Sequence, residues 1–153
     1  MESKLTWQKE MTFLAVNRDI TSHLDATREF GGGNSAPTPK EALLNSLSAC
    51  SAMDVLSILT KMRITMDKFS ITADAVPTKT IPSYFGVVNL KFHVEGNLAA
   101  EKLISAVALS MTKLCGVGYM ISLVCPINYE IFLNSKSIHS DVAKFSVEVL
   151  NGQ

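Results

Sequence analysis

The longest run of apolar positions in the chain, from Thr38 to about Arg63, predicts one long helix. Apolar side chains recur from Leu43 to Met62 on more than one helical face, and no proline or glycine interrupts them. Thr38 is the expected N-cap, Pro39 suits the first helical position, and Glu41 completes a capping box. A helix of about 36 Å that is apolar over most of its circumference is typical of the centre of a structure.

Alternation of apolar and polar residues predicts strands on both sides of this helix. The expected strands are residues 4–9, 11–16, 20–25, 69–76, 84–95 and 127–133, with a possible last strand at 144–150. The clearest runs from Tyr84 to Glu95, where the apolar side chains point one way and His93 falls on the polar face. The first two strands are expected to pair as a hairpin.

A second helix is predicted over residues 98–114, and a further short helix over residues 117–124. Gly116 is expected to end the second helix in a left-handed conformation. Because strands come in runs and do not alternate with helices, the expected fold class is α+β, with a mainly antiparallel sheet packed on the long central helix. We expect one domain, residues 1–153, with a core at about 5–133 and a C-terminal extension at 134–153.

The glycine-rich segment at residues 28–37, REFGGGNSAP, is expected to be a surface loop. Three consecutive glycines are compatible with a phosphate-binding loop. The Gly-Lys-Ser/Thr ending of such a loop is absent here, so we do not interpret the segment in this way.

Composition narrows the classes of function. The 14 basic and 14 acidic residues balance, with no basic patch, which argues against nucleic acid or an anionic membrane as partner. We found no uncharged apolar segment of 18 residues or more and no apolar signal core near the N-terminus, so we expect a cytoplasmic protein without a membrane span. Its thiols should then be reduced.

Three cysteines carry the candidate chemistry. Cys50 shares a helical stripe with Ser46 and Asp54, and spacing alone is more typical of a small buried side chain than of a reactive thiol. Cys115 precedes the N-terminus of the next expected helix, which is the better place for a thiolate. Cys125 precedes a proline and is expected to be structural. No metal site is expected, because there is no C-x-x-C motif and the three histidines lie far apart.

The motif P-x-E-x-L-(x)₆-C, followed by SAMDVLSIL and later by KLCGV, resembles the OsmC/Ohr family of osmotically induced and organic-hydroperoxide-resistance proteins. Within it, the chain looks like the OsmC-like branch of small bacterial YhfA-type proteins. The likeness covers about residues 5–133, including the WxxxMTFL opening and the NLKFHVEG strand. It implies an intertwined homodimer with two central helices and a six-stranded sheet from each subunit.

The resemblance also implies a thiol-dependent peroxide reductase that prefers organic hydroperoxides and needs no cofactor. Cys50 would attack the O–O bond and become a sulfenic acid, Cys115 would condense with it to a disulfide, and an external dithiol would reduce that disulfide.

The family's hydroperoxide branch holds the thiolate with an arginine that a glutamate positions. The candidates here are Arg18 or Arg28, with Glu41 one place after the family's glutamate. Gly116 stands where the family has a proline.

The alternative is a non-catalytic dimer of the same fold that binds a small apolar ligand at the dimer interface. Tyr84 and Phe85 are the aromatic candidates for lining either kind of site, and both are also compatible with a plain core role.

Overall fold

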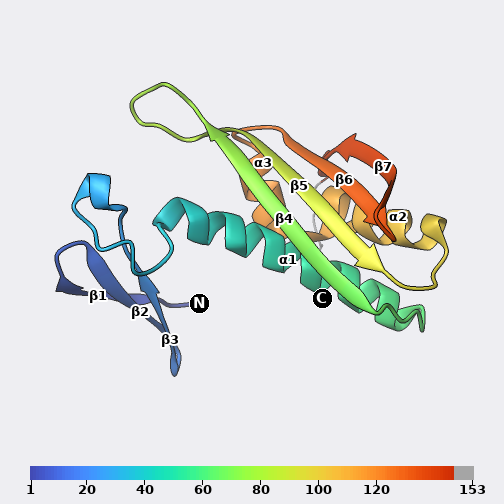
Figure 1. The fold of residues 1–153 in the computed structure, drawn as a ribbon, viewed down its shortest axis with the longest axis horizontal. Coiled ribbons are helices and arrows are strands. Elements are labelled where there is room, and N and C mark those ends of the chain that lie inside the picture. Colours follow the sequence, from blue (N-terminus) through green and yellow to red (C-terminus); the bar gives the residue numbers. More distant parts are fainter. Residues whose placement is uncertain (147–153) are drawn as a thin grey trace, which may run out of the picture. The chain divides into compact units, whose positions relative to one another are not determined.

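The computed structural model describes residues 1–146, and the chain divides into two compact units, Met1–Asn45 and Ser46–Gln153. The central helix α1 runs through this boundary, so each unit is described by itself. Figure 1 shows the elements, which in chain order are β1 (Lys4–Lys9), β2 (Thr12–Asn17), β3 (Ile20–Leu24), η1 (Arg28–Phe30), α1 (Pro39–Lys61), β4 (Lys68–Pro77), β5 (Phe85–Glu95), α2 (Ala100–Leu109), η2 (Ser110–Leu114), α3 (Gly116–Ser122), β6 (Ile127–Leu133) and β7 (Lys136–Val142).

The first unit carries an antiparallel sheet in the order β1-β2-β3, which contains the predicted hairpin of the first two strands and the predicted third strand. The two tight connections place Glu10 and Arg18 at positive φ, 48° and 57°, in the left-handed region that such turns use. Every residue of β1 is exposed, and Trp7 at 64% exposure donates its indole N–H to the Glu10 carbonyl. Only Ala15 is a buried apolar residue in this sheet.

The glycine-rich loop folds around Asp25. This carboxylate is 2% exposed and accepts hydrogen bonds from the amides of Ala26, Gly33 and Ser35 and from the Ser35 hydroxyl, at 2.8–3.1 Å. The Ser35 amide is the largest cause that lowers the pKa of Asp25 from 3.8 to about 2. Two amides of the glycine-rich loop, those of Gly33 and Ser35, therefore donate hydrogen bonds to a carboxylate of their own chain.

Helix α1 begins with the predicted capping box. The Thr38 amide donates to a Glu41 carboxylate oxygen at 2.8 Å, and the Glu41 amide donates to the Thr38 hydroxyl at 3.3 Å. The hydrogen bond from the Thr38 amide is the largest cause that lowers the pKa of the Glu41 carboxyl, and the Thr38 side chain lowers it further. A single stripe at four-residue spacing is fully buried: Leu47, Ser51, Val55 and Leu59.

By length and composition alone, α1 is apolar enough to cross a membrane, a property that core helices of soluble proteins share. Asp54 lies in its middle, where a bilayer would make a carboxylate costly. The absence of a membrane partner remains a prediction.

The second unit carries a sheet in the order β4-β5-β6-β7. The outer pairs are antiparallel, while β5 and β6 run parallel because the helical crossover α2–η2–α3 joins them. The fold is therefore α+β with a long central helix, as predicted. The expectation of one six-stranded sheet was wrong within residues 1–146, where seven strands form a three-stranded and a four-stranded sheet.

The core of the second unit lies between one face of this sheet and its helices. Alternate residues of β5, from Val88 to Val94, are buried as the sequence predicted, and α3 packs against β6. The buried helical side chains opposite them are Leu103, Ala106, Val107 and Met111. Figure 1 shows α2 and α3 behind the sheet.

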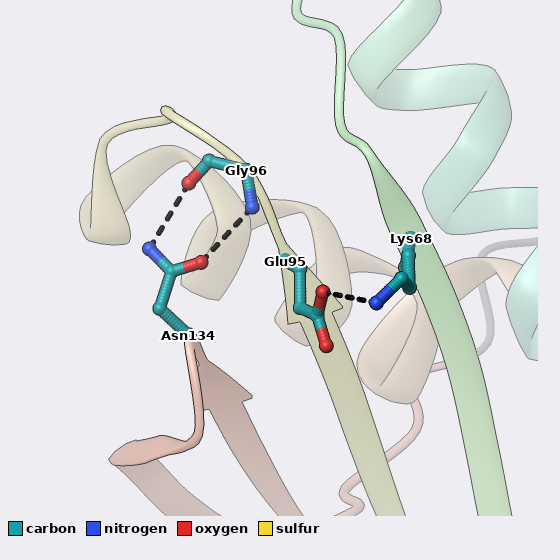
Figure 2. Close-up of polar contacts among 4 residues, drawn as sticks. All are labelled: Lys68, Glu95, Gly96 and Asn134. Carbon is teal, nitrogen blue, oxygen red and sulfur yellow. Dashed lines mark hydrogen bonds and ion pairs between the residues drawn. The ribbon is translucent and has the colours of Figure 1, made fainter.

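Two polar contacts hold one end of the sheet (Figure 2). The Asn134 side chain accepts a hydrogen bond from the Gly96 amide at 3.0 Å and donates one to the Gly96 carbonyl at 3.1 Å. These two bonds link the ends of β5 and β6. Gly96 has φ +149° and lies against the backbone of Met66, so a larger residue would be strained there. Lys68 and Glu95 add an exposed ion pair at 2.8 Å.

Strand β7 lies in the segment for which the sequence predicted only a polar opening. It pairs with β6 and extends the sheet, so part of the expected C-terminal extension belongs to this unit. Of the possible strand at 144–150, residues 144–146 have no regular structure, and the remainder lies outside the described residues.

Candidate thiol site

The structure brings together two of the predicted site residues, Cys50 and Cys115. Their sulfur atoms and a carboxylate oxygen of Asp54 all lie within 4.8 Å of one another, and both cysteines are free thiols. Cys50 lies on α1 and is half-buried, whereas Cys115, at the junction of η2 and α3, is 1% exposed. The two thiols are 65 positions apart in the sequence.

A break between two helical segments positions Cys115. Its backbone is extended (φ −69°, ψ 97°), so it ends η2 and is the N-cap of α3, with its sulfur accepting the Gly118 N–H at 3.2 Å. The expectation that Gly116 closes a helix in the left-handed conformation was wrong, because Gly116 is the first residue of α3. A Cβ on Gly118 would lie 3.2 Å from this sulfur and 2.8 Å from Phe145, so the close approach requires glycine.

Burial decides the ionisation of Cys115. Desolvation is the largest cause that raises the pKa of this thiol to about 11, and the Cys50 side chain also raises it. The Ser51 hydroxyl, which donates to the sulfur at 3.3 Å, and the Gly118 amide lower it, but they do not compensate for burial. The expectation that Cys115 is the better place for a thiolate was therefore wrong.

Asp54 is the neighbour of these thiols that sequence reasoning did not place in the site. It lies one helical turn after Cys50 and accepts a hydrogen bond from the buried Ser110 hydroxyl at 2.9 Å. The i, i+4 spacing placed Asp54 on the Cys50 stripe, but only the fold brings Ser110 and Cys115 to the same point. No local pattern in the sequence carries this signal.

The other candidate site residues fall in the first unit. Arg18 is exposed in the β2–β3 turn, and Arg28 is exposed in η1. The Glu41 carboxylate is engaged as a helix cap. Their part in a site with Cys50 stays a prediction.

Two further residue predictions concern the second unit. Cys125 is 4% exposed, and burial raises its pKa, as a structural thiol requires. Tyr84 is 45% exposed just before β5, and Phe85, the first residue of that strand, is half-buried. The role of these two aromatic residues as lining of the site stays a prediction.

Comparisons with known proteins agree with this architecture. Residues 32–130 match the family model of the OsmC-like proteins. The protein YhfA of Escherichia coli K12 is 31% identical over 122 residues, which span 79% of this chain and 89% of YhfA.

Solved structures show the same fold. A hypothetical protein from Aquifex aeolicus is 26% identical with a TM-score of 0.74, covering 87% of this chain and 96% of that one. An organic hydroperoxide resistance protein, OsmC, from Legionella pneumophila is 18% identical with a TM-score of 0.63, covering 85% and 94%. Together with the matched family model, these likenesses establish that the chain belongs to the OsmC-like protein family.

Proposed function

We propose that this protein is a thiol-dependent peroxide reductase that prefers organic hydroperoxides, with Cys50 as the peroxidatic and Cys115 as the resolving cysteine. The observation that carries the proposal is the approach of the two sulfur atoms to within 4.8 Å. A disulfide needs about 2.05 Å, so closing the bond requires a sulfur displacement of less than about 3 Å. Side-chain rotation and a small shift at the η2–α3 junction supply displacements of this size.

The difference in solvent exposure between Cys50 and Cys115 supports the roles assigned to the two thiols. Cys50 is half-buried and within reach of solutes, whereas Cys115 is almost completely buried. Peroxide therefore reacts with Cys50 first, and the neighbouring Cys115 is the thiol that reacts with the oxidised Cys50.

The proposed reaction has three steps. The Cys50 thiolate attacks one peroxide oxygen, the O–O bond breaks, and the alkoxide leaves as the alcohol after taking a proton, which gives a Cys50 sulfenic acid. The Cys115 sulfur then attacks the Cys50 sulfur, the S–O bond breaks, and hydroxide leaves as water with the Cys115 proton. An external dithiol reduces the resulting disulfide by two exchange steps and becomes oxidised itself.

A homodimer is part of this proposal. Large apolar side chains are exposed on each of the two units of the single chain, which favours their burial in a protein interface. The exposed set comprises Leu5, Trp7 and Ile20 in the first unit and Met53, Leu56, Met120, Leu123 and Val124 in the second. A second copy that covers them gives the thiols an apolar entrance, which favours organic over inorganic peroxide.

The activating residues and the setting are also proposals. Arg18 or Arg28 supplies the cation that stabilises the Cys50 thiolate, and Glu41 positions it while capping α1. The name of the Legionella protein, an organic hydroperoxide resistance protein of the same fold, supports the substrate class. We place the reaction in the cytoplasm, where dithiol reductants are available.

A peroxide titration tests the proposal. Reduced protein, kept in EDTA, is mixed with cumene hydroperoxide, and free thiols and intact mass are followed with time. We expect the rapid loss of two thiols per chain in the wild type and in the control variant Cys125→Ala. Cys50→Ser should lose none rapidly, and Cys115→Ser should accumulate over-oxidised Cys50. Oxidation no faster than that of free cysteine would overturn the peroxidase and favour the dimer that binds an apolar ligand.

A further inference from the structure

Cys50, Asp54 and Cys115 form a cluster of metal-ligating groups, with two sulfur atoms and a carboxylate oxygen within 4.8 Å of one another. Cys50 and Asp54 lie four residues apart on α1, so they share one face of the helix, and Cys115 approaches them from the η2–α3 junction. We propose that in the reduced protein these three side chains bind one borderline-soft divalent transition-metal ion, Zn²⁺ above all. Peroxide reduction as proposed above neither requires nor predicts this ion.

The spacing of the three ligand atoms fits a tetrahedral ion. Zn²⁺ takes sulfur at about 2.3 Å and carboxylate oxygen at about 2.0–2.2 Å, which places the ligand atoms roughly 3.5–3.8 Å apart. Separations of at most 4.8 Å therefore need to shrink by about 1 Å, which side-chain rotation achieves. Three protein ligands leave the fourth position for water. Because Cys50 and Asp54 are only half-buried, solvent can reach that position.

The ligand types select the class of ion. Thiolate sulfur favours zinc and other soft or borderline ions, whereas Mg²⁺ and Ca²⁺ prefer sites made entirely of oxygen. Binding exchanges one cation for two thiol protons, which are released to the buffer, so the occupied site carries a net charge of −1. Local spacing does not predict this set of ligands, because Cys115 comes from a distant junction and the set includes neither histidine nor a C-x-x-C motif.

Buried hydrogen bonds hold the ligands in place. The Ser110 hydroxyl donates to Asp54 at 2.9 Å, and the Ser51 hydroxyl and the Gly118 N–H donate to the Cys115 sulfur at 3.3 and 3.2 Å. Both serines are 0% exposed. Hydrogen bonds of this kind orient metal ligands and stabilise their charge. All ligands and their partners belong to the second unit, so the site is complete in one chain.

A cobalt titration tests the site. Reduced, full-length protein is treated with EDTA, freed of the chelator and titrated anaerobically with Co²⁺. We expect one Co²⁺ per chain, with the thiolate-to-cobalt charge-transfer band and the intense visible bands of a tetrahedral site. Zn²⁺ should then bleach both sets of bands by displacing the cobalt. Bound Zn²⁺ should also protect two thiols per chain from a thiol reagent.

Four variants assign the ligands. Ser110→Ala should weaken Zn²⁺ binding about 10-fold or more, as loss of an outer hydrogen bond to a ligand does. Asp54→Asn, which keeps the shape but loses the charge, should weaken it further. Asp74→Asn and Cys125→Ala are matched controls from the same unit and should bind as the wild type does.

The proposal is overturned if the wild type shows no tetrahedral thiolate spectrum, or if Asp54→Asn and Ser110→Ala both bind as tightly as wild type. Should Asp54→Asn not fold, as judged by circular dichroism, Ser110→Ala and the wild-type stoichiometry decide the question. The peroxide titration is run in EDTA, so it succeeds or fails independently of this result.

Discussion

The two units of this chain differ in how they are stabilised. The second unit contains nearly the whole apolar core, from Leu47 to Ile131, together with both sulfur atoms of the thiol site. The first unit has a single buried apolar residue, Ala15, and its fold depends on turns, the hydrogen bonds around Asp25 and the cap of α1. A three-stranded sheet with exposed faces is marginal in water. The two thiols therefore lie on the well-packed unit, whereas the first unit has little apolar core of its own.

The largest effect is expected in the core of the second unit. Phe92→Ala removes a ring that is 0% exposed and should lower the free energy of unfolding by about 3–5 kcal/mol. Phe30→Ala in the first unit removes a ring that is 70% exposed and should change it by less than about 0.5 kcal/mol. Urea denaturation followed by circular dichroism measures both, and equal effects would contradict the contrast between the units.

A smaller loss is expected at the thiol site. Ser110→Ala leaves the half-buried Asp54 carboxylate without its side-chain donor and should cost about 1–3 kcal/mol of unfolding free energy. Ser105→Ala is the matched control, since the Ser105 hydroxyl donates to the Glu101 carbonyl of its own helix, α2. If urea midpoints shift equally in the two variants, the Asp54–Ser110 contact contributes nothing specific.

The first unit should respond to acid through Asp25. Its pKa is lowered in the folded state to about 2 from 3.8, so its contribution to stability is fully present above about pH 4 and disappears as the pH falls towards 2. The stability difference between wild type and Asp25→Asn should therefore shrink over this interval. Thermal denaturation followed through the fluorescence of Trp7, the single tryptophan, reports on this unit.

The variant Asp19→Asn serves as the control for acid sensitivity, because Asp19 is exposed in the β2–β3 turn. It should follow the wild type at every pH. A difference between wild type and Asp25→Asn that stays constant from pH 6 to pH 2 would contradict the hydrogen-bonding role given to Asp25.

The smallest effect is expected at the cap of α1. Thr38→Ala removes the hydroxyl that accepts a hydrogen bond from the Glu41 amide. It should lower the free energy of unfolding by about 1 kcal/mol, near the low end of what urea denaturation resolves. Glu41→Gln keeps the shape of its partner and should cost less. Its measured peroxidase rate also tests the catalytic role proposed for Glu41, since a change of rate beyond the change of stability is not expected of a cap alone.

The sequence predicted what local patterns encode. Three features each depend on a short stretch of sequence: the capping box, the β1–β2 hairpin and the buried face of β5. The structure confirms all three. Strand β7 was missed because its side chains are mostly exposed, which leaves no apolar alternation to detect. Gly116 was misjudged because a glycine after a helix is typical of a C-terminal cap, whereas here the extended Cys115 separates two helical segments.

The candidate site was only partly predictable for the same reason. Family resemblance identified Cys50 and Cys115, and the structure places their sulfur atoms together. The contact between Asp54 and Ser110 joins residues 56 positions apart, and such contacts depend on the packing of α1 against η2, not on local spacing. The burial that raises the pKa of Cys115 is likewise a property of the folded unit.

The most direct test of the central claim is the intact mass of the protein after one equivalent of cumene hydroperoxide. We expect a rapid loss of two hydrogen masses per chain, with peptide mapping that joins Cys50 to Cys115 within one chain. A product that gains oxygen at Cys50 while Cys115 stays a free thiol would contradict the claim that these two sulfur atoms act as a pair.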